Sequence, residues 1–320
     1  MKAWKKALGL VLVWVAIVIA FNVSLQGNFA TAQNLEIMIR QTVLTGFAAI
    51  GMTFIIITGA IDLSVGSLVA LVTVVIAFCL KAGMPPLPAA AVGVLAGGVA
   101  GLVNGGLTTK LKVGSFIVTL ATLLAFRGIA KGVANEQKID VPMNWLRSLT
   151  GALPDGQKWQ LLPPGGWMVI ALGLVAHWVL NSSVFGRHVV ATGSNEATAR
   201  MCGINTDRVR VLVFILAGLC FGLSGLTQFS RLTVGDPTVA AGLELSVIAA
   251  VVIGGASLNG GEGSVFGSLI GALIMTTIAS GGSQCGWPNW VQEIVTGAII
   301  LTAVALDRWR LARAAAQGAE

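Results

Sequence analysis

Residues 182–210 read SSVFGRHVVATGSNEATARMCGINTDRVR, the longest polar interruption in the chain that carries a compact helix pattern. A hydrophobic block lies on each side of this stretch, and the two blocks contain similar numbers of apolar segments. The stretch therefore divides the chain into two halves and predicts a connection that lies outside the apolar core.

A short helix is predicted inside this loop, from Asn195 to Cys202. Ser194 is a good candidate N-cap because its hydroxyl can accept from a free amide of the first turn. Glu196 and Arg200 would lie near the positive and negative ends of the helix dipole, and Gly203 suits a left-handed C-cap. A helix of two turns is not stable alone in water. It is either a well-capped surface element or an element that docks on a partner.

The composition indicates an integral membrane protein. Mean hydropathy is +0.86, hydrophobic residues make up 55% of the chain and charged residues 10%. Segments of about 20 apolar residues are long enough to cross a bilayer. We expect an all-α fold of about ten transmembrane helices, in a single transmembrane domain over residues 1–320. The expected spans are 8–25, 35–57, 63–80, 88–107, 115–133, 166–181, 210–230, 243–257, 264–281 and 290–306.

The distribution of basic residues predicts the orientation. With the N-terminus inside, 12 of the 20 basic residues fall on the cytoplasmic side, as the positive-inside rule requires. They are Lys2, Lys5, Lys6, Lys110, Lys112, Arg187, Arg200, Arg208, Arg210, Arg308, Arg310 and Arg313. Both termini and the 182–210 loop are then predicted to be cytoplasmic.

The join between the second and third spans, residues 58–67, is predicted to interrupt a helix. Gly59 and Gly66 flank Asp62 in an otherwise apolar run. Unwound backbone at membrane depth is tolerated only where protein buries it or where it lines a cavity. A carboxylate there costs about 2.5–3.5 kcal/mol on insertion scales, so it usually has a partner or a function. Two interpretations stay open: a broken helix that lines a substrate path, or a tight cytoplasmic turn capped by Asp62.

Glycines recur every four residues in two spans and predict close helix packing. They are Gly93, Gly97, Gly101 and Gly105 in the fourth span, and Gly263, Gly267 and Gly271 in the ninth. Asn104 lies beside the first series and could hydrogen-bond across the contact. Arg127, inside the fifth span, needs a carbonyl or acidic partner, and we favour a structural role for it.

The second half of the sequence echoes the first. Glu244, Leu245 and Ser246 echo Asp62, Leu63 and Ser64. The glycine series of the fourth span recurs in the ninth span. This pattern suggests two inverted five-helix repeats, an arrangement in which transporters place their sites between the repeats. The spacing of the echoes differs between the halves, so the repeat is suggestive only.

Three stretches resemble the permease subunits of ribose-type sugar ABC importers. They read GAIDLSVGS at 59–67, GSNEATARMCGI at 193–204, and the glycine-rich run at 248–272. The similarity covers nearly the whole chain and is weakest at 1–30 and 134–165. It implies that the short loop helix fits a groove on a separate ATPase subunit. The residues assigned to this coupling are Asn195, Glu196, Ala199, Arg200 and Gly203.

The resemblance also implies partners and a location. They are two ABC ATPase subunits, a second permease copy or paralogue, a periplasmic sugar-binding protein and the lipid of a bacterial inner membrane. The sugar would pass between permease subunits or repeats by alternating access. Little charge along the path suits a neutral polyol. The residues that we place on the path are Asp62, Ser64, Asn104, Glu244 and Ser246.

Several classes of function are not supported by the sequence. It contains no G-x-x-x-x-G-K-[ST] motif, so this chain should not hold ATP in a phosphate loop; we expect no enzyme activity and no bound cofactor. His177 and His188 have no Cys or acidic neighbours at ligand spacing, so no metal site is predicted. The net charge of +7 comes without a basic run interleaved with aromatics and does not indicate nucleic acid.

Two alternatives remain. An ion-coupled secondary transporter or channel would use Asp62 and Glu244 as coupling groups, but it would have no ATPase on which the loop helix could dock. A permease of the same superfamily for amino acids or nucleosides is disfavoured by the segment at 61–64.

Overall fold

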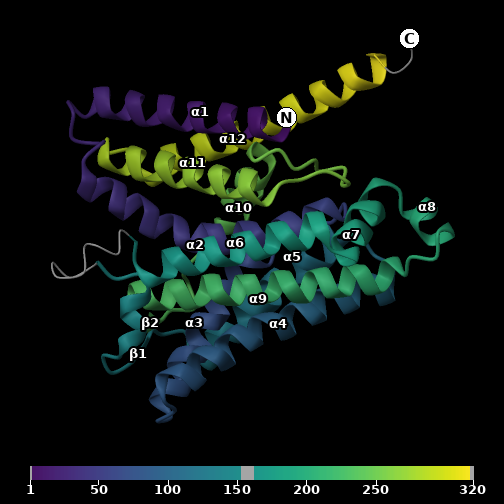
Figure 1. Cartoon of the computed structure of the whole chain (residues 1–320). Coiled ribbons are helices and arrows are strands. Elements are labelled where there is room, and N and C mark those ends of the chain that lie inside the picture. Colours follow the sequence, from purple (N-terminus) through teal and green to yellow (C-terminus); the bar gives the residue numbers. More distant parts are fainter. Residues whose placement is uncertain (1, 153–161, 318–320) are drawn as a thin grey trace.

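The computed structural model describes residues 2–152 and 162–317, and it places the side chains of residues 7–152 and 162–305. The described chain is almost entirely helical (Figure 1). The helices are α1 (Lys2–Ser24), α2 (Ala32–Ile57), α3 (Val65–Lys81), α4 (Pro86–Leu111), α5 (Ser115–Val133), α6 (Pro164–Ser182), α7 (Val184–Ser194), α8 (Glu196–Met201), α9 (Thr206–Leu232), α10 (Leu243–Ile253), α11 (Val265–Gln284) and α12 (Asn289–Gln317).

The connections hold little other regular structure. A 3₁₀ helix, η1 (Trp145–Leu149), lies in the connection between α5 and α6. Two short strands, β1 (Ile139–Asp140) and β2 (Val234–Gly235), pair antiparallel. They tie this connection to the segment that follows α9. Part of the predicted outer loop, residues 153–161, lies outside the described residues.

Each of the ten expected spans falls on a helix. Seven described helices are long and apolar enough to cross a membrane, and α3, α10 and the apolar part of α12 (289–305) are shorter. The expected span 243–257 was too long, because Gly254 and Gly255 end α10 and Gly255 has a φ of +93°. The chain is thus an all-helical integral membrane protein, and its exact number of crossings stays a prediction.

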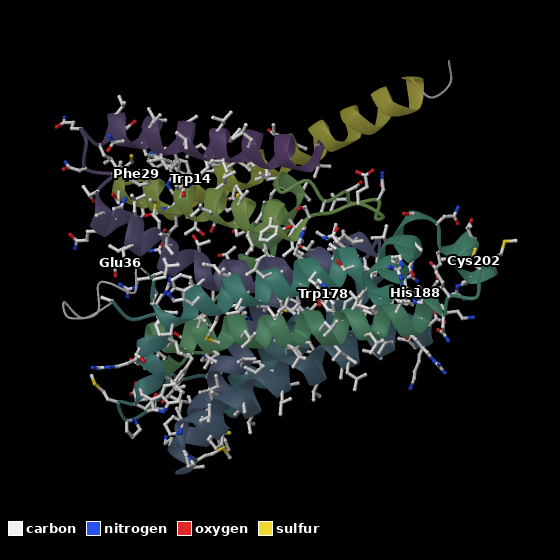
Figure 2. The ribbon with its side chains drawn as sticks, in the orientation of Figure 1. Trp14, Phe29, Glu36, Trp178, His188 and Cys202 are labelled. Atoms are coloured by element: carbon white, nitrogen blue, oxygen red, sulfur yellow. The ribbon has the colours of Figure 1, made fainter. Side chains whose placement is uncertain are left out.

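Helices α2 and α9 form the centre of the bundle (Figure 1). α9 packs against α2, α3 and α4, while α2 also packs against α10 and α11. α1 lies at the periphery on α11. Its Trp14 indole donates to the Thr277 hydroxyl at 3.0 Å (Figure 2).

Helix pairs match across the two halves of the chain. The α3–α4, α3–α5, α3–α9 and α4–α9 contacts correspond to the α10–α11, α10–α12, α10–α2 and α11–α2 contacts. The third helix of each half, α3 or α10, is short and follows irregular backbone. Two inverted repeats would produce this pairing; the repeat stays a prediction that the pairing supports.

The glycine series lie where helices approach closely. A methyl group on Gly97 or Gly101 would meet the backbone of α9, at the carbonyl oxygens of Gly218 and Phe214 respectively. In the second series, a methyl group on Gly267 or Gly271 would meet carbonyl oxygens of the α10 segment. These backbones approach so closely that no side chain fits between them.

We expect Gly101→Ala to lower the melting temperature and the yield of the folded protein. The added methyl group meets backbone, which cannot rotate away, and overpacking of this kind costs about 1–3 kcal/mol. Gly106→Ala is the matched control, because Gly106 lies in the same helix with nothing within 4 Å of the added carbon. Thermal denaturation in detergent measures both. Equal melting temperatures for the two variants would contradict this account of the α4–α9 contact.

Candidate functional site

The backbone between α2 and α3 is unwound, and Asp62 organises it. Its side chain is buried, with 1% of the residue exposed. The carboxylate Oδ1 accepts hydrogen bonds from the backbone N–H and the hydroxyl of Ser64, both at 2.7 Å. These contacts form a turn that ends at the first residue of α3, Val65. The Asp62 side chain thus closes this turn, and both interpretations of the segment stay predictions.

Asn104 of α4 completes this cluster. Its Nδ2 donates to Asp62 Oδ2 at 3.2 Å and to Ser64 Oγ at 2.8 Å, whereas its own Oδ1 is buried without a partner. Within the described part of the chain, no basic side chain pairs with the Asp62 carboxylate. Three of the residues assigned to the substrate path therefore meet in one buried hydrogen-bonded group.

Side chains of α5 form hydrogen bonds with the backbone of the unwound segment between α2 and α3. The Ser115 hydroxyl accepts from Ile61 N–H at 3.0 Å, and the Thr119 hydroxyl accepts from Leu63 N–H at 3.1 Å. The Thr119 hydroxyl also lies 3.3 Å from the Ile61 carbonyl oxygen. Sequence reasoning missed both residues, because a Ser and a Thr in an apolar helix carry no specific signal.

Glu244 lies against the start of α3. A methyl group on Gly66 would clash with the Glu244 carboxylate and with the Ala240 carbonyl oxygen. The first turns of α3 and α10 thus face each other, as the echoed sequences suggest. Glu244 makes no hydrogen bond to the Asp62 cluster and instead accepts from Gly242 N–H at 3.2 Å. Ser246 lines a separate cavity among α2, α10, α11 and α12.

Arg127 of α5 holds the segment before α10. Its Nη1 donates to the carbonyl oxygens of Pro237 and Val239, at 2.9 and 2.7 Å. The next residue, Ala240, has a φ of +59°, a conformation that is uncommon for a residue with a side chain. Arg127 therefore has the carbonyl partners that a structural role requires.

The 182–210 loop contains two helices, α7 and α8. The N-cap of α8 is Asn195, whose side chain accepts from Thr198 N–H at 2.9 Å. The predicted cap, Ser194, was wrong: α7 extends through Ser194, and its hydroxyl donates to the Val190 carbonyl. Gly203 has a φ of +84° after the end of α8, as the sequence predicts.

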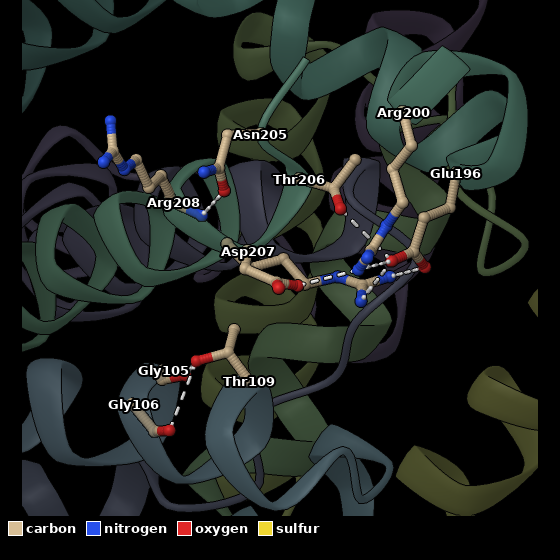
Figure 3. Close-up of polar contacts among 10 residues, drawn as sticks. Gly105, Gly106, Thr109, Glu196, Arg200, Asn205, Thr206, Asp207 and Arg208 are labelled. Carbon is tan, nitrogen blue, oxygen red and sulfur yellow. Dashed lines mark hydrogen bonds and ion pairs between the residues drawn. The ribbon is translucent and has the colours of Figure 1, made fainter. Parts of the chain in front are cut away.

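Ion pairs tie α8 to the first turns of α9 (Figure 3). The Arg210 guanidinium binds both carboxylate oxygens of Glu196, at 2.6 and 3.1 Å. Arg200 bridges Glu196 at 2.9 Å and Asp207 at 2.8 Å. Burial acts to raise the pKa of Glu196, but the hydrogen bonds and charges of Arg210 and Arg200 outweigh it and lower that pKa. Arg200 is therefore balanced by two carboxylates of its own chain.

The C-terminal end of α8 exposes two side chains that carry no charge. Met201 is 88% exposed, and Cys202 beside it is also exposed (Figure 2). Ala199 is 4% exposed and packs inward. Of the residues assigned to coupling, Ala199 thus faces the protein, whereas Met201, which was not among them, is exposed.

Gly193 joins this loop to the membrane helices. A methyl group on Gly193 would overlap the Ile57 carbonyl oxygen at the end of α2, and would also meet Gly261 N. Gly261 N–H donates to the same Ile57 carbonyl at 2.8 Å. The end of α2, the α10–α11 connection and the end of α7 therefore meet at one point. Gly193 therefore places the α7–α8 loop against the end of α2 and against the α10–α11 connection.

These features describe a polytopic membrane protein with unwound backbone before α3 and an α-helical loop seated on the end of α2 and on the α10–α11 connection. The sequence model of the family described as branched-chain amino acid transport system / permease component matches residues 34–304. The chain belongs to this family of permeases.

Its curated relatives are sugar permeases. It is 37% identical to the ribose import permease protein RbsC of Escherichia coli (strain K12) over 309 residues, which cover 96% of this chain and 95% of the relative. It is 39% identical to RbsC of Bacillus subtilis (strain 168) over 285 residues, 89% and 87% of the two chains. It is 34% identical to the L-arabinose ABC transporter permease protein AraH of Azospirillum brasilense over 302 residues, 94% and 87%. No solved structure matches the chain.

Proposed function

We propose that this chain is the membrane-spanning permease of an ATP-binding-cassette importer that translocates a monosaccharide. The named substrates of its relatives, ribose and L-arabinose, are small neutral sugars. The family description is broader than this and names branched-chain amino acids. The relatives match almost the full length of the chain, so they carry more weight for the substrate class.

The observation that carries the mechanism is the contact at Gly193. A separate ATPase subunit would bind the exposed side of α8, and a second permease would complete the translocation path. Closure of the ATPase subunits would move α8 together with the start of α9, since Arg200 pairs with Asp207 and Arg210 with Glu196. It would also move α7, which joins α8 at Asn195. The same motion would reach Ile57 and Gly261 through Gly193 and shift the interrupted helices.

The proposed orientation has α8 in the cytoplasm, with a periplasmic binding protein at the opposite end. The start of α1 and the end of α12 lie toward the α8 end of the bundle (Figure 1). The basic residues of the α8–α9 region, such as Arg200 and Arg210, fit a cytoplasmic side. The protein is then a multi-pass protein of a bacterial inner membrane with both termini inside.

Reconstitution tests the proposal. We expect proteoliposomes that contain the permease and its ATPase subunit to take up D-ribose, L-arabinose or D-xylose only with both ATP and the binding protein present. L-leucine is the control solute for the amino-acid alternative. Uptake that follows an imposed proton or sodium gradient without ATP would contradict the proposal and support an ion-coupled transporter.

A further inference from the structure

A cavity of about 190 Å³ lies among α2, α10, α11 and α12, beside the last turn of α9. Arg231 in the last turn of α9 and Trp287 just after α11 place it at the end of the bundle opposite α8. Its lining combines polar side chains with one indole ring and contains no carboxylate. The polar side chains that carry the argument are Gln41, Thr45, Arg231, Ser246 and Thr296.

These polar side chains have no partner within the described part of the chain. Among the described residues, none of the five side chains makes a hydrogen bond or an ion pair. A Ser or Thr hydroxyl in an apolar helix ordinarily bonds a carbonyl of the preceding turn, as Thr42 of α2 does with Met38 at 2.8 Å. Thr45 lies one turn further along α2, is only 8% exposed, and makes no such bond. Thr45 is thus a buried hydroxyl without a partner among the described residues, whereas Gln41, Ser246 and Thr296 are half-buried and Arg231 is exposed. A polar group of this kind inside a membrane bundle is costly and typically serves a function.

An indole ring forms one apolar wall of the cavity. Trp287 packs against Phe21, with ring centroids 5.9 Å apart, and against Gly282, where a methyl group would lie 2.7 Å from the ring. These contacts fix the orientation of the ring. Ligand sites typically combine such apolar walls with a few convergent polar groups. A sugar ring presents matching surfaces, with C–H groups on its faces and hydroxyls around its edge.

We propose that this cavity is a monosaccharide subsite of the permease, at the end that would face the periplasm. Thr45, Ser246, Thr296 and Gln41 would bind ring hydroxyls, and Arg231 at the mouth would donate to a sugar oxygen. The volume of about 190 Å³ suits one small ring. The proposal rests on the proposed transport function, and it adds the residues that hold the sugar.

The first test is transport by the reconstituted complex. We expect the double variant Thr45→Val, Ser246→Ala to reduce sugar uptake about tenfold, because each lost hydrogen bond weakens binding about two- to tenfold. Its ATPase activity stimulated by the binding protein should stay within about twofold of wild type. Thr42→Val is the matched control, since its hydroxyl bonds its own helix away from the cavity. Uptake by the double variant equal to that of the control overturns the proposal.

The second test measures occupancy without transport. In the complex carrying Ser246→Cys, the rate of N-ethylmaleimide modification is read at that position by peptide mass spectrometry. This readout keeps position 246 separate from the four native cysteines. We expect D-ribose, L-arabinose or D-xylose to slow the reaction at least about threefold, and L-leucine to leave it unchanged.

The two readouts distinguish failure of the subsite from failure of the transport function. If a sugar protects position 246 but the wild-type complex shows no ATP-driven uptake, the cavity binds sugar and the proposed transport function is wrong. If wild-type uptake is normal but none of the three sugars protects position 246, the proposed function stands and the cavity is not a sugar subsite.

Discussion

Replacing Gly193 by alanine is expected to uncouple ATP hydrolysis from sugar uptake. The added methyl group would overlap the Ile57 carbonyl oxygen, and neither that oxygen nor Gly261 N can move without disturbing the hydrogen bond between them. The α7–α8 loop must therefore shift away from the end of α2. Overpacking of about 1–3 kcal/mol corresponds to a change of about 5–150-fold in a coupled equilibrium. We therefore expect the rate of sugar uptake to decrease about 5–150-fold relative to wild type.

The measurement pairs uptake and ATPase activity stimulated by the binding protein with a melting curve. The Gly193→Ala protein should melt within a few degrees of wild type, because the contact lies at the edge of the bundle. Gly132→Ala is the control, since an added carbon at Gly132 meets nothing within 4 Å. Wild-type uptake and stimulation in Gly193→Ala would mean that the joint at Ile57 does not transmit motion.

Asp62→Ala should have the largest effect on stability. The substitution removes the acceptor of Ser64 N–H, of the Ser64 hydroxyl and of one Asn104 amide contact, all of them buried. Each buried group left without a partner costs about 1–3 kcal/mol. The unwound segment then loses the turn that starts α3. We expect little folded protein to be recovered, as measured by gel filtration in detergent and by thermal denaturation.

Asp62→Asn is the matched variant. Its side-chain oxygen can still accept from the Ser64 N–H and hydroxyl, but its amide would face Asn104 Nδ2, so that one hydrogen bond is lost. We expect a stability between those of wild type and Asp62→Ala. Normal sugar uptake by this variant would show that Asp62 serves only to cap the turn before α3. Loss of uptake by a stable variant would place Asp62 on the substrate path. A stable, well-expressed Asp62→Ala protein would contradict the prediction.

Hydropathy and glycine placement predicted much of the fold. Apolar runs locate the helices because the bilayer fixes their length, and the glycines around Asp62 locate the break because they weaken a helix. The ends of helices were less predictable. Ser194 looked like a cap from its neighbours, yet α7 continues through it because the loop packs against α6 and α9.

The contacts that assemble the candidate site were not predictable from the sequence. Gly193, Ile57 and Gly261 are far apart in the chain, and only the packed structure shows that they meet. Ser115 and Thr119 bind the unwound backbone through ordinary hydroxyls. Arg200, which the sequence assigned to a partner, is neutralised by Glu196 and Asp207. Met201 is the most exposed large apolar side chain of α8 and is proposed as a contact residue.

The central claim, that α8 binds an ATPase subunit, can be tested at a native cysteine. Cys202 is exposed beside Met201 at the end of α8, whereas Cys220 is buried within α9. The assembled importer is labelled with a photoactivatable maleimide and irradiated. The account predicts a crosslink between this chain and the ATPase subunit that disappears in the Cys202→Ser variant. An intact complex that gives no crosslink at Cys202 would contradict it.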